Sequence, residues 1–228
     1  QMCIRDRAWS CADMDSFFNR IRREEAPIPM RKQAVHTVAV LLLGIGLGIF
    51  SKFLDNTASN ALPAILEYLD LRNLLGRFDI WLLIALCISV YSRSSIRAAL
   101  NVFVFFAGMV SSYYLYSNFI AGFFPKSYAM IRFGLTAISP LLAFICWYAK
   151  GTGKVSFALS AIIIAVLFNA SFTYGWLYFD VYSILEGIVF VCGLAVLKRS
   201  TIKESTFMIV CGVAIAFVLN LLIPFHFG

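Results

Sequence analysis

The sequence is poor in charged residues. Asp, Glu, Lys and Arg make up 14% of its 228 residues, whereas a soluble domain usually carries about 25%. Hydrophobic residues make up 61%, which is more than a soluble fold of this length buries, because folded proteins leave much of their surface exposed. In a bilayer, lipid-facing side chains need no polar cover, although every backbone group must still be paired. The composition excludes an ordinary soluble domain and predicts an integral membrane protein.

Catalytic and metal-binding motifs are also missing. The sequence contains no H-E-x-x-H, no G-x-S-x-G, no Walker lysine loop and no paired-aspartate motif. His36 and His226 fall at opposite faces of the predicted membrane domain, so they cannot share a metal ion. None of the six cysteines forms a C-x-x-C pair. We therefore expect no enzyme activity, no metal site and no cofactor.

The net charge of +7 does not indicate a nucleic-acid partner, because no Arg/Gly-rich tract or nucleic-acid-binding signature accompanies it. Basic residues instead form short clusters between apolar runs, as in loops that face the cytoplasm and anionic lipid. Placing the N-terminus inside and the C-terminus outside puts most of them on the inner side. That inner set is Arg20, Arg22, Arg23, Arg31, Lys32, Arg93, Arg97, Lys150, Lys154, Lys198, Arg199 and Lys203.

The apolar runs are continuous rather than alternating, which favours helices over a barrel. We predict an all-α bundle of about seven transmembrane helices, each near the length that crosses the hydrocarbon core. The predicted spans are Ala34–Phe53, Ile80–Val90, Ala98–Phe119, Ala129–Ala149, Val155–Tyr174, Val181–Leu197 and Phe207–Ile223.

Residues 1–29 do not share this pattern. Their opening, Gln-Met-Cys-Ile-Arg-Asp-Arg, resembles a translated adaptor. We expect residues 1–29 to be non-native or disordered and residues 30–228 to form a single transmembrane domain. Met30 is the expected native start, with Met14 as the alternative.

The longest loop, from Asp55 to Asp79, carries its own helix signals. Pro63 suits a first helical turn and Gly76 a helix end. Apolar residues recur between them at helical spacing, which predicts a short amphipathic helix on the outer membrane surface. A mobile polar loop is the alternative.

Gly44 and Gly48 in the first span form a G-x-x-x-G motif, which lets another helix approach closely. Packing within the bundle is the favoured interpretation, and docking of a partner membrane subunit is the other. In the fourth span, Pro140 cannot donate to the carbonyl of Thr136. That carbonyl either lines a cavity or is satisfied by Ser139 or a neighbouring helix.

Glu186 is the most suggestive single residue, because a carboxylate inside a span takes up a proton or finds a cation. Arg132 enters the fourth span from the same side, so we predict an Arg132–Glu186 pair. Asn169 and Tyr113 lie in the same outer halves and complete a predicted ligand-binding pocket. The alternatives are an ion pair that only locks the bundle, a Glu186 that reaches the interface, and aromatic residues that form an interfacial belt.

Several short motifs resemble a family of small bacterial membrane proteins of unassigned function. They are Leu43–Gly48 with Ser51–Asp55, Pro125–Tyr128, and Trp147–Gly151. The resemblance covers about Met30 to the C-terminus and implies a compact helical bundle in the bacterial cytoplasmic membrane, without a substrate. The span count is also similar to that of the substrate-binding subunits of energy-coupling-factor transporters, whose first helix docks the energising module through small residues.

The sequence thus predicts a membrane protein that binds or transports a small solute in an outward-facing polar pocket. The alternative is a non-transporting accessory protein that binds a partner subunit. A membrane enzyme that acts on lipid is a third hypothesis. Neither the solute nor the coupling ion follows from the sequence.

Overall fold

The computed structural model describes residues 17–26, 28–57, 63–175 and 177–222. Within these ranges the regular secondary structure consists of helices and one short hairpin. The elements are α2 (Met30–Asn56), α3 (Ala64–Tyr68), α4 (Leu71–Gly76), α5 (Asp79–Val90), α6 (Ser95–Phe119), α7 (Lys126–Tyr148), α8 (Gly153–Ser171), β1 (Phe172–Tyr174), β2 (Phe179–Val181), α9 (Ile184–Leu197) and α10 (Ile202–Leu222).

Five of these helices are long and apolar enough to cross a membrane, namely α2, α6, α7, α8 and α10. The apolar helices α5 and α9 have only 12 and 14 residues. At about 1.5 Å per residue they extend about 18 and 21 Å, short of the roughly 30 Å hydrocarbon core. The structure therefore supports a helical multi-pass protein with five candidate spans, and a count of seven stays a prediction.

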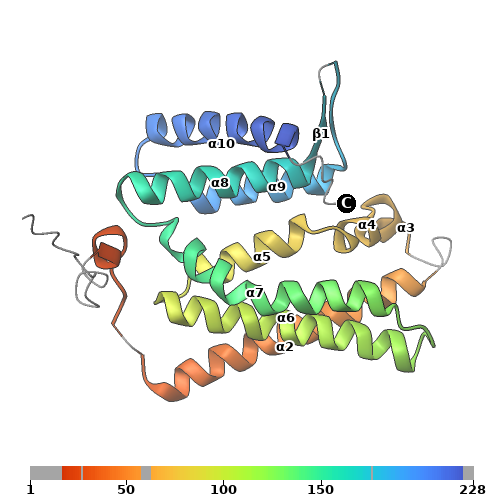
Figure 1. Ribbon diagram of the computed structural model, residues 1–228. Coiled ribbons are helices and arrows are strands. Elements are labelled where there is room, and N and C mark those ends of the chain that lie inside the picture. Colours follow the sequence, from red (N-terminus) through yellow and green to blue (C-terminus); the bar gives the residue numbers. More distant parts are fainter. Residues whose placement is uncertain (1–16, 27, 58–62, 176, 223–228) are drawn as a thin grey trace, which may run out of the picture.

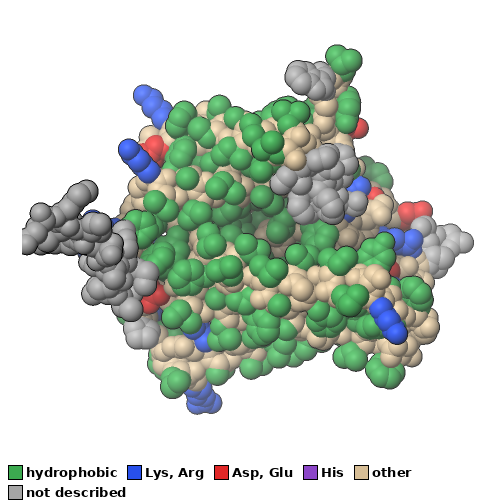
Figure 2. Space-filling model, viewed as in Figure 1, with side chains coloured by type: hydrophobic (Ala, Val, Ile, Leu, Met, Phe, Trp, Pro, Cys, Tyr) green, Lys and Arg blue, Asp and Glu red, His purple; other side chains and the backbone are tan. Residues whose placement is uncertain are grey.

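The helices form two layers around a short central one (Figure 1). Helices α2, α6 and α7 lie on one side, and α8, α9 and α10 lie on the other, while α5 contacts α6, α7, α8 and α9. Hydrophobic side chains cover the middle of the face in Figure 2, with charged side chains towards its two ends. This distribution is compatible with contact with a bilayer.

We call the two ends of the bundle the N-terminal end, beside residues 17–26, and the hairpin end, beside β1 and β2 (Figure 1). At the hairpin end, two predicted spans have different limits in the structure. Helix α8 ends at Ser171 and the chain continues into β1, where Thr173 pairs with Asp180 of β2. Helix α9 consequently begins at Ile184 rather than at Val181.

The predicted helix between the first two spans is two short helices. Pro63 precedes α3 and Gly76 ends α4, at the positions that the sequence indicated. Asp70 separates them in a left-handed conformation, with φ 51°, which a continuous helix does not accommodate. Their position on the membrane surface stays a prediction.

Close contact between α2 and α6 depends on Gly44 and Gly48. A Cβ atom at Gly44 would overlap the carbonyl oxygen of Phe105, and one at Gly48 would overlap that of Met109. Both glycines therefore pack α2 against α6 of the same chain, so this face of α2 is not open to a partner. In α7, Ser139 Oγ donates to the Thr136 carbonyl at 2.8 Å, which satisfies the acceptor that Pro140 leaves free.

Residues 17–26 pack against the bundle, although the sequence interpretation left them outside it. Ile21 is buried in a cluster with Trp147 and Tyr148. The Ile21 carbonyl accepts a hydrogen bond of 2.7 Å from the Thr152 N–H, and Glu25 N–H donates to the Arg93 carbonyl at 3.0 Å. The part of the predicted non-native segment before residue 17 lies outside the described residues.

Basic side chains at the N-terminal end of the bundle donate hydrogen bonds to carbonyl groups at the C-terminal ends of helices. Lys150 Nζ donates to Val196 O at 2.5 Å, at the end of α9. Arg199 donates to Gly151 O at 2.7 Å and to Ala149 O at 3.2 Å, just beyond α7. Burial lowers the pKa of Lys150, and the positive charges of Arg199 and Arg22 lower it further. These cations act on helix C-termini, where positive charge is favourable.

Candidate functional site

The four predicted ligand-binding residues lie in three separate places. Glu186 bonds to Arg77, whereas the Arg132 guanidinium lies 5.1 Å from the centre of the Tyr113 ring. Asn169 accepts a hydrogen bond from the Tyr174 hydroxyl and donates to Ala216 O at 3.3 Å, joining α8 to β1 and α10. The structure therefore does not bring the four together around one pocket.

The predicted Arg132–Glu186 pair is wrong, because Arg77 occupies the Glu186 carboxylate. Arg77 Nη1 lies 3.0 Å from Oε1 and 3.2 Å from Oε2. The Arg77 guanidinium also lies 3.8 Å from the centre of the Tyr182 ring. Glu186 sits in the first turn of α9, where Ser183 Oγ accepts its backbone N–H at 3.4 Å. It is therefore close to the helix start rather than several residues inside a span.

Asp79 is a second buried carboxylate at this end of the bundle, and the sequence interpretation did not select it. Its exposed fraction is 0% and that of Glu186 is 1%. The positive charge of Arg77 acts on Asp79, and the charge of Asp79 acts on Glu186. The N–H groups of Asp79 and Ile80 lie close to its carboxylate, yet neither oxygen accepts a hydrogen bond of normal geometry within the described structure.

The environment of this cluster does not balance two ionised carboxylates. Removing one ionised group from water costs several kcal/mol after relaxation. The N-terminus of a helix offsets about 0.3–1 kcal/mol of that, or up to about 2 kcal/mol where the geometry is favourable. In the described structure Arg77 is the one guanidinium beside both Asp79 and Glu186, and each carboxylate lies in the first turn of its own helix. One negative charge is therefore left over when both are ionised.

Tyr113 and Arg132 belong to a different polar cluster, which joins α2, α6 and α7. The Tyr113 hydroxyl donates to Asp55 Oδ2 at 2.5 Å. Lys52 lies 3.9 Å from the same oxygen and 5.1 Å from the centre of the Tyr113 ring. These contacts tie α2, α6 and α7 together, and the Arg132 guanidinium joins them only through the face of the Tyr113 ring.

A polar cavity of about 560 Å³ lies at the N-terminal end of the bundle. That volume is in the range of small-molecule sites. The lining comes from residues 24, 25 and 28, from the start of α2, from the end of α5 and from the loop that leads into the start of α6. None of the four predicted site residues lines it. Its polar side chains include those of Glu24, Glu25, Gln33, His36, Arg93, Arg97 and Asn101.

Arg97 and Asn101 present hydrogen-bond donors from one face of α6, because they are four residues apart. Arg97 Nη2 donates to Gln33 O and to Thr37 Oγ1, both at 2.8 Å. Asn101 Oδ1 accepts from Thr37 Oγ1 at 3.0 Å. These bonds orient both side chains, and among the described residues Arg97 Nη1 and Nε and Asn101 Nδ2 have no hydrogen-bond partner. A charge-assisted hydrogen bond from Arg97 suits a carboxylate or a phosphate.

The cavity also contains a carboxylate that is not neutralised. Glu24 Oε1 accepts a hydrogen bond from Ser95 Oγ at 3.3 Å, and neither Glu24 nor Arg97 has an ion pair among the residues described. Arg93 instead pairs with Glu25 at 3.7 Å. Among the described residues the site therefore offers one positive and one negative group that have no ion pair.

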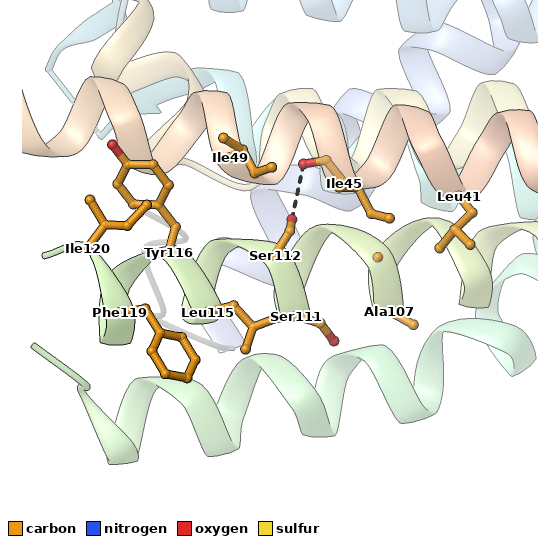
Figure 3. Close-up of a pocket in the computed structure, with 11 residues that line it drawn as sticks. Leu41, Ile45, Ile49, Ala107, Ser111, Ser112, Leu115, Tyr116, Phe119 and Ile120 are labelled. Atoms are coloured by element: carbon orange, nitrogen blue, oxygen red, sulfur yellow. Dashed lines mark hydrogen bonds between the residues drawn. The ribbon is translucent and has the colours of Figure 1, made fainter. Parts of the chain in front are cut away.

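A second hollow is an apolar groove of about 640 Å³ along α2 and α6 (Figure 3). Leu41, Ile45 and Ile49 line it from α2, and Ala107, Ser111 and Leu115 line it from α6. Ser112 donates to Ile45 O at 3.1 Å across the two helices. The groove offers shape and apolar surface but no charged group.

Within the described ranges no group of three His, Cys, Asp or Glu residues could hold a metal ion. Comparison with family models, with characterised proteins and with solved structures finds no match to this chain. The resemblance to small bacterial membrane proteins of unassigned function consequently stays a prediction, and the function has to be argued from the geometry alone.

Proposed function

We propose that this chain is a multi-pass membrane protein that binds or transports a small polar solute and is not an enzyme. The site that supports this best is the polar cavity at the N-terminal end. The single observation that carries it is that Arg97 and Glu24, which have no ion pair among the described residues, line one cavity of about 560 Å³. A solute with an anionic and a cationic group matches them, so we propose a zwitterion of the amino-acid class.

The placement of the site follows from the predicted topology. We propose that α5 and α9 complete a bundle of seven membrane helices in the bacterial cytoplasmic membrane, with the N-terminus inside and the C-terminus outside. Basic residues at the N-terminal end favour the cytoplasmic side. The solute site then faces inward, which differs from the outward-facing pocket expected near Arg132 and Glu186.

Thermal stability of the purified protein tests this proposal. Amino acids, betaines, phosphoethanolamine, nucleobases and vitamins are added one class at a time. A ligand at about a hundred times its dissociation constant stabilises the native state by about 2.7 kcal/mol, so we expect zwitterions to raise the unfolding midpoint. A shift with soluble amino acids indicates a free solute, whereas a shift with phosphoethanolamine alone indicates a lipid headgroup.

The variants Arg97→Gln and Glu24→Gln should lose this ligand-induced shift, each measured against its own ligand-free midpoint. Arg23→Gln is the matched control, because Arg23 is an exposed cation at the same end and does not line the cavity. A zwitterion shift that survives in both cavity variants, or no zwitterion shift in wild type, overturns the proposal.

The apolar groove between α2 and α6 favours a second candidate, an accessory protein that binds a helix of a partner membrane subunit. The groove is lined mostly by apolar side chains, including Leu41, Ala107 and Leu115. If solute binding fails, cross-linking from Ser111→Cys in native membranes tests this alternative, since Ser111 lines the groove (Figure 3).

A further inference from the structure

The buried charges at the hairpin end form a site distinct from the solute cavity. The ends of α4, α5, α8 and α9 meet there. Arg77, Asp79 and Glu186 are the charged groups that these elements contribute. Arg72, the other cation of α4, is committed elsewhere, because it donates to the Leu54 and Thr57 carbonyls at the end of α2.

Three buried oxygen atoms of this region accept no hydrogen bond of normal geometry in the described structure: Asp79 Oδ1 and Oδ2, which only the N–H groups of Asp79 and Ile80 approach, and Ser171 Oγ. Asp79 and Ser171 both have an exposed fraction of 0%. Ser171 adjoins the cluster through Tyr182, whose N–H donates to Ser171 O at 3.4 Å and whose ring stacks on Arg77. Buried polar atoms are normally satisfied, so an unpaired set requires an explanation.

We propose that this cluster binds a monovalent alkali cation, with Asp79 and Ser171 as ligands and Glu186 beside them. Carboxylate and hydroxyl oxygens are the donors that hard cations take. Arg77 balances one of the two carboxylates, so one positive charge neutralises the site and a divalent ion would overcharge it. The carbonyl end of α8, at Ser171, also favours a cation.

A proton on Asp79 is the competing way to neutralise the site. It would satisfy one oxygen of the three and would itself need an acceptor, whereas the proposed cation would take all three oxygens as ligands. Sodium binding in other membrane proteins likewise uses the carbonyl ends of helices. The cation therefore accounts for more of the unpaired atoms.

Thermal unfolding of the full chain in detergent, with NaCl, KCl or LiCl exchanged for choline chloride at constant ionic strength, tests the proposal. We expect an alkali chloride to raise the unfolding midpoint with saturation. Asp79→Asn should abolish this rise. Asp55→Asn should keep it, because Asp55 is a carboxylate at the same end that already binds Tyr113 and Lys52.

Ser171→Ala provides a second variant in case Asp79→Asn does not fold. We expect Ser171→Ala to raise the half-saturating concentration of the cation about tenfold. That is the lower end of the loss in affinity that follows when residues around a metal site are replaced. Equal midpoints in alkali and choline salts, or an unchanged cation response in both variants, overturn the proposal. A midpoint that depends on pH through Asp79 but not on the cation also overturns it, in favour of a proton site. Zwitterion binding through Arg97 is measured separately, so either site can fail alone.

Discussion

Arg22 donates a hydrogen bond of 2.7 Å to the carbonyl oxygen of Trp147, and its guanidinium lies 4.2 Å from the centre of the Trp147 indole ring. A second donor of Arg22 reaches Val90 O at 2.9 Å. Trp147 itself is fully buried and donates through Nε1 to Ser92 O at 2.7 Å. Residues 17–26 are thereby tied to the ends of α5 and α7, next to the polar cavity.

Replacing Arg22 by Gln should destabilise the protein by about 2–3 kcal/mol, because hydrogen bonds from a charged donor contribute about 1.5–3 kcal/mol and Arg22 is partly exposed. The free energy of unfolding in a denaturant series measures this. Arg23→Gln is the control and should change it by less than about 0.5 kcal/mol. Equal effects of the two substitutions would mean that residues 17–26 do not pack as described.

The two glycines Gly46 and Gly48 should respond to alanine in opposite directions. A Cβ at Gly48 overlaps Met109 O and Ser112 Oγ, whereas one at Gly46 meets nothing within 4 Å. Gly48→Ala should therefore cost about 1–3 kcal/mol through overpacking. Gly46→Ala should stabilise by about 0.5–1 kcal/mol, since alanine is the better helix former. Unfolding midpoints of the two variants check this, and a stabilised Gly48→Ala would contradict the α2–α6 contact.

Arg77→Gln should destabilise more than Glu186→Gln. Losing Arg77 leaves two buried carboxylates without a counter-ion, a change of about 3–5 kcal/mol. Losing the Glu186 charge leaves Arg77, whose side chain is 27% exposed and can turn to water, and it removes the repulsion from Asp79.

A double-mutant cycle between Arg77 and Glu186 should show a coupling energy of about 0.5–3 kcal/mol. The same cycle between Arg132 and Glu186 is the control and should show none. A coupling energy between Glu186 and Arg132, with none between Glu186 and Arg77, would contradict the observed ion pair and support the pair predicted from the sequence.

Tyr113→Phe should cost about 1–2 kcal/mol, because it removes a hydrogen bond to the charged Asp55 carboxylate. Tyr116→Phe is the matched control on the same helix, since its side chain lines the apolar groove. Thermal unfolding of the two variants measures the difference. Equal midpoints would show that Tyr113 is not a tie between α2 and α6.

Local features were predictable from the sequence. Each long apolar run contains a helix, because the apolar pattern that indicates a helix is present in the local sequence of the span itself. Pro63 and Gly76 mark helix ends as predicted. Ser139 satisfies the carbonyl that Pro140 frees, which the sequence offered as one of several alternatives.

Long-range pairing was not predictable. Arg77 and Glu186 are separated by 109 residues, and Arg77 lay in a loop that the sequence placed on the surface. The hairpin was missed because Phe172–Tyr174 continues the apolar run of α8 and only pairing with Phe179–Val181 makes it a strand. The polar cavity was missed because its basic residues were interpreted only as topology signals. The four-residue spacing of Arg97 and Asn101 on one helix was the available signal.

Titration calorimetry with the zwitterion that raises the unfolding midpoint tests the central claim most directly. We predict one binding site per chain in wild type and in Arg23→Gln, and loss of binding in both Arg97→Gln and Glu24→Gln. Absence of binding by wild type, or unchanged affinity in the two cavity variants, would contradict a solute site at the N-terminal end of the bundle.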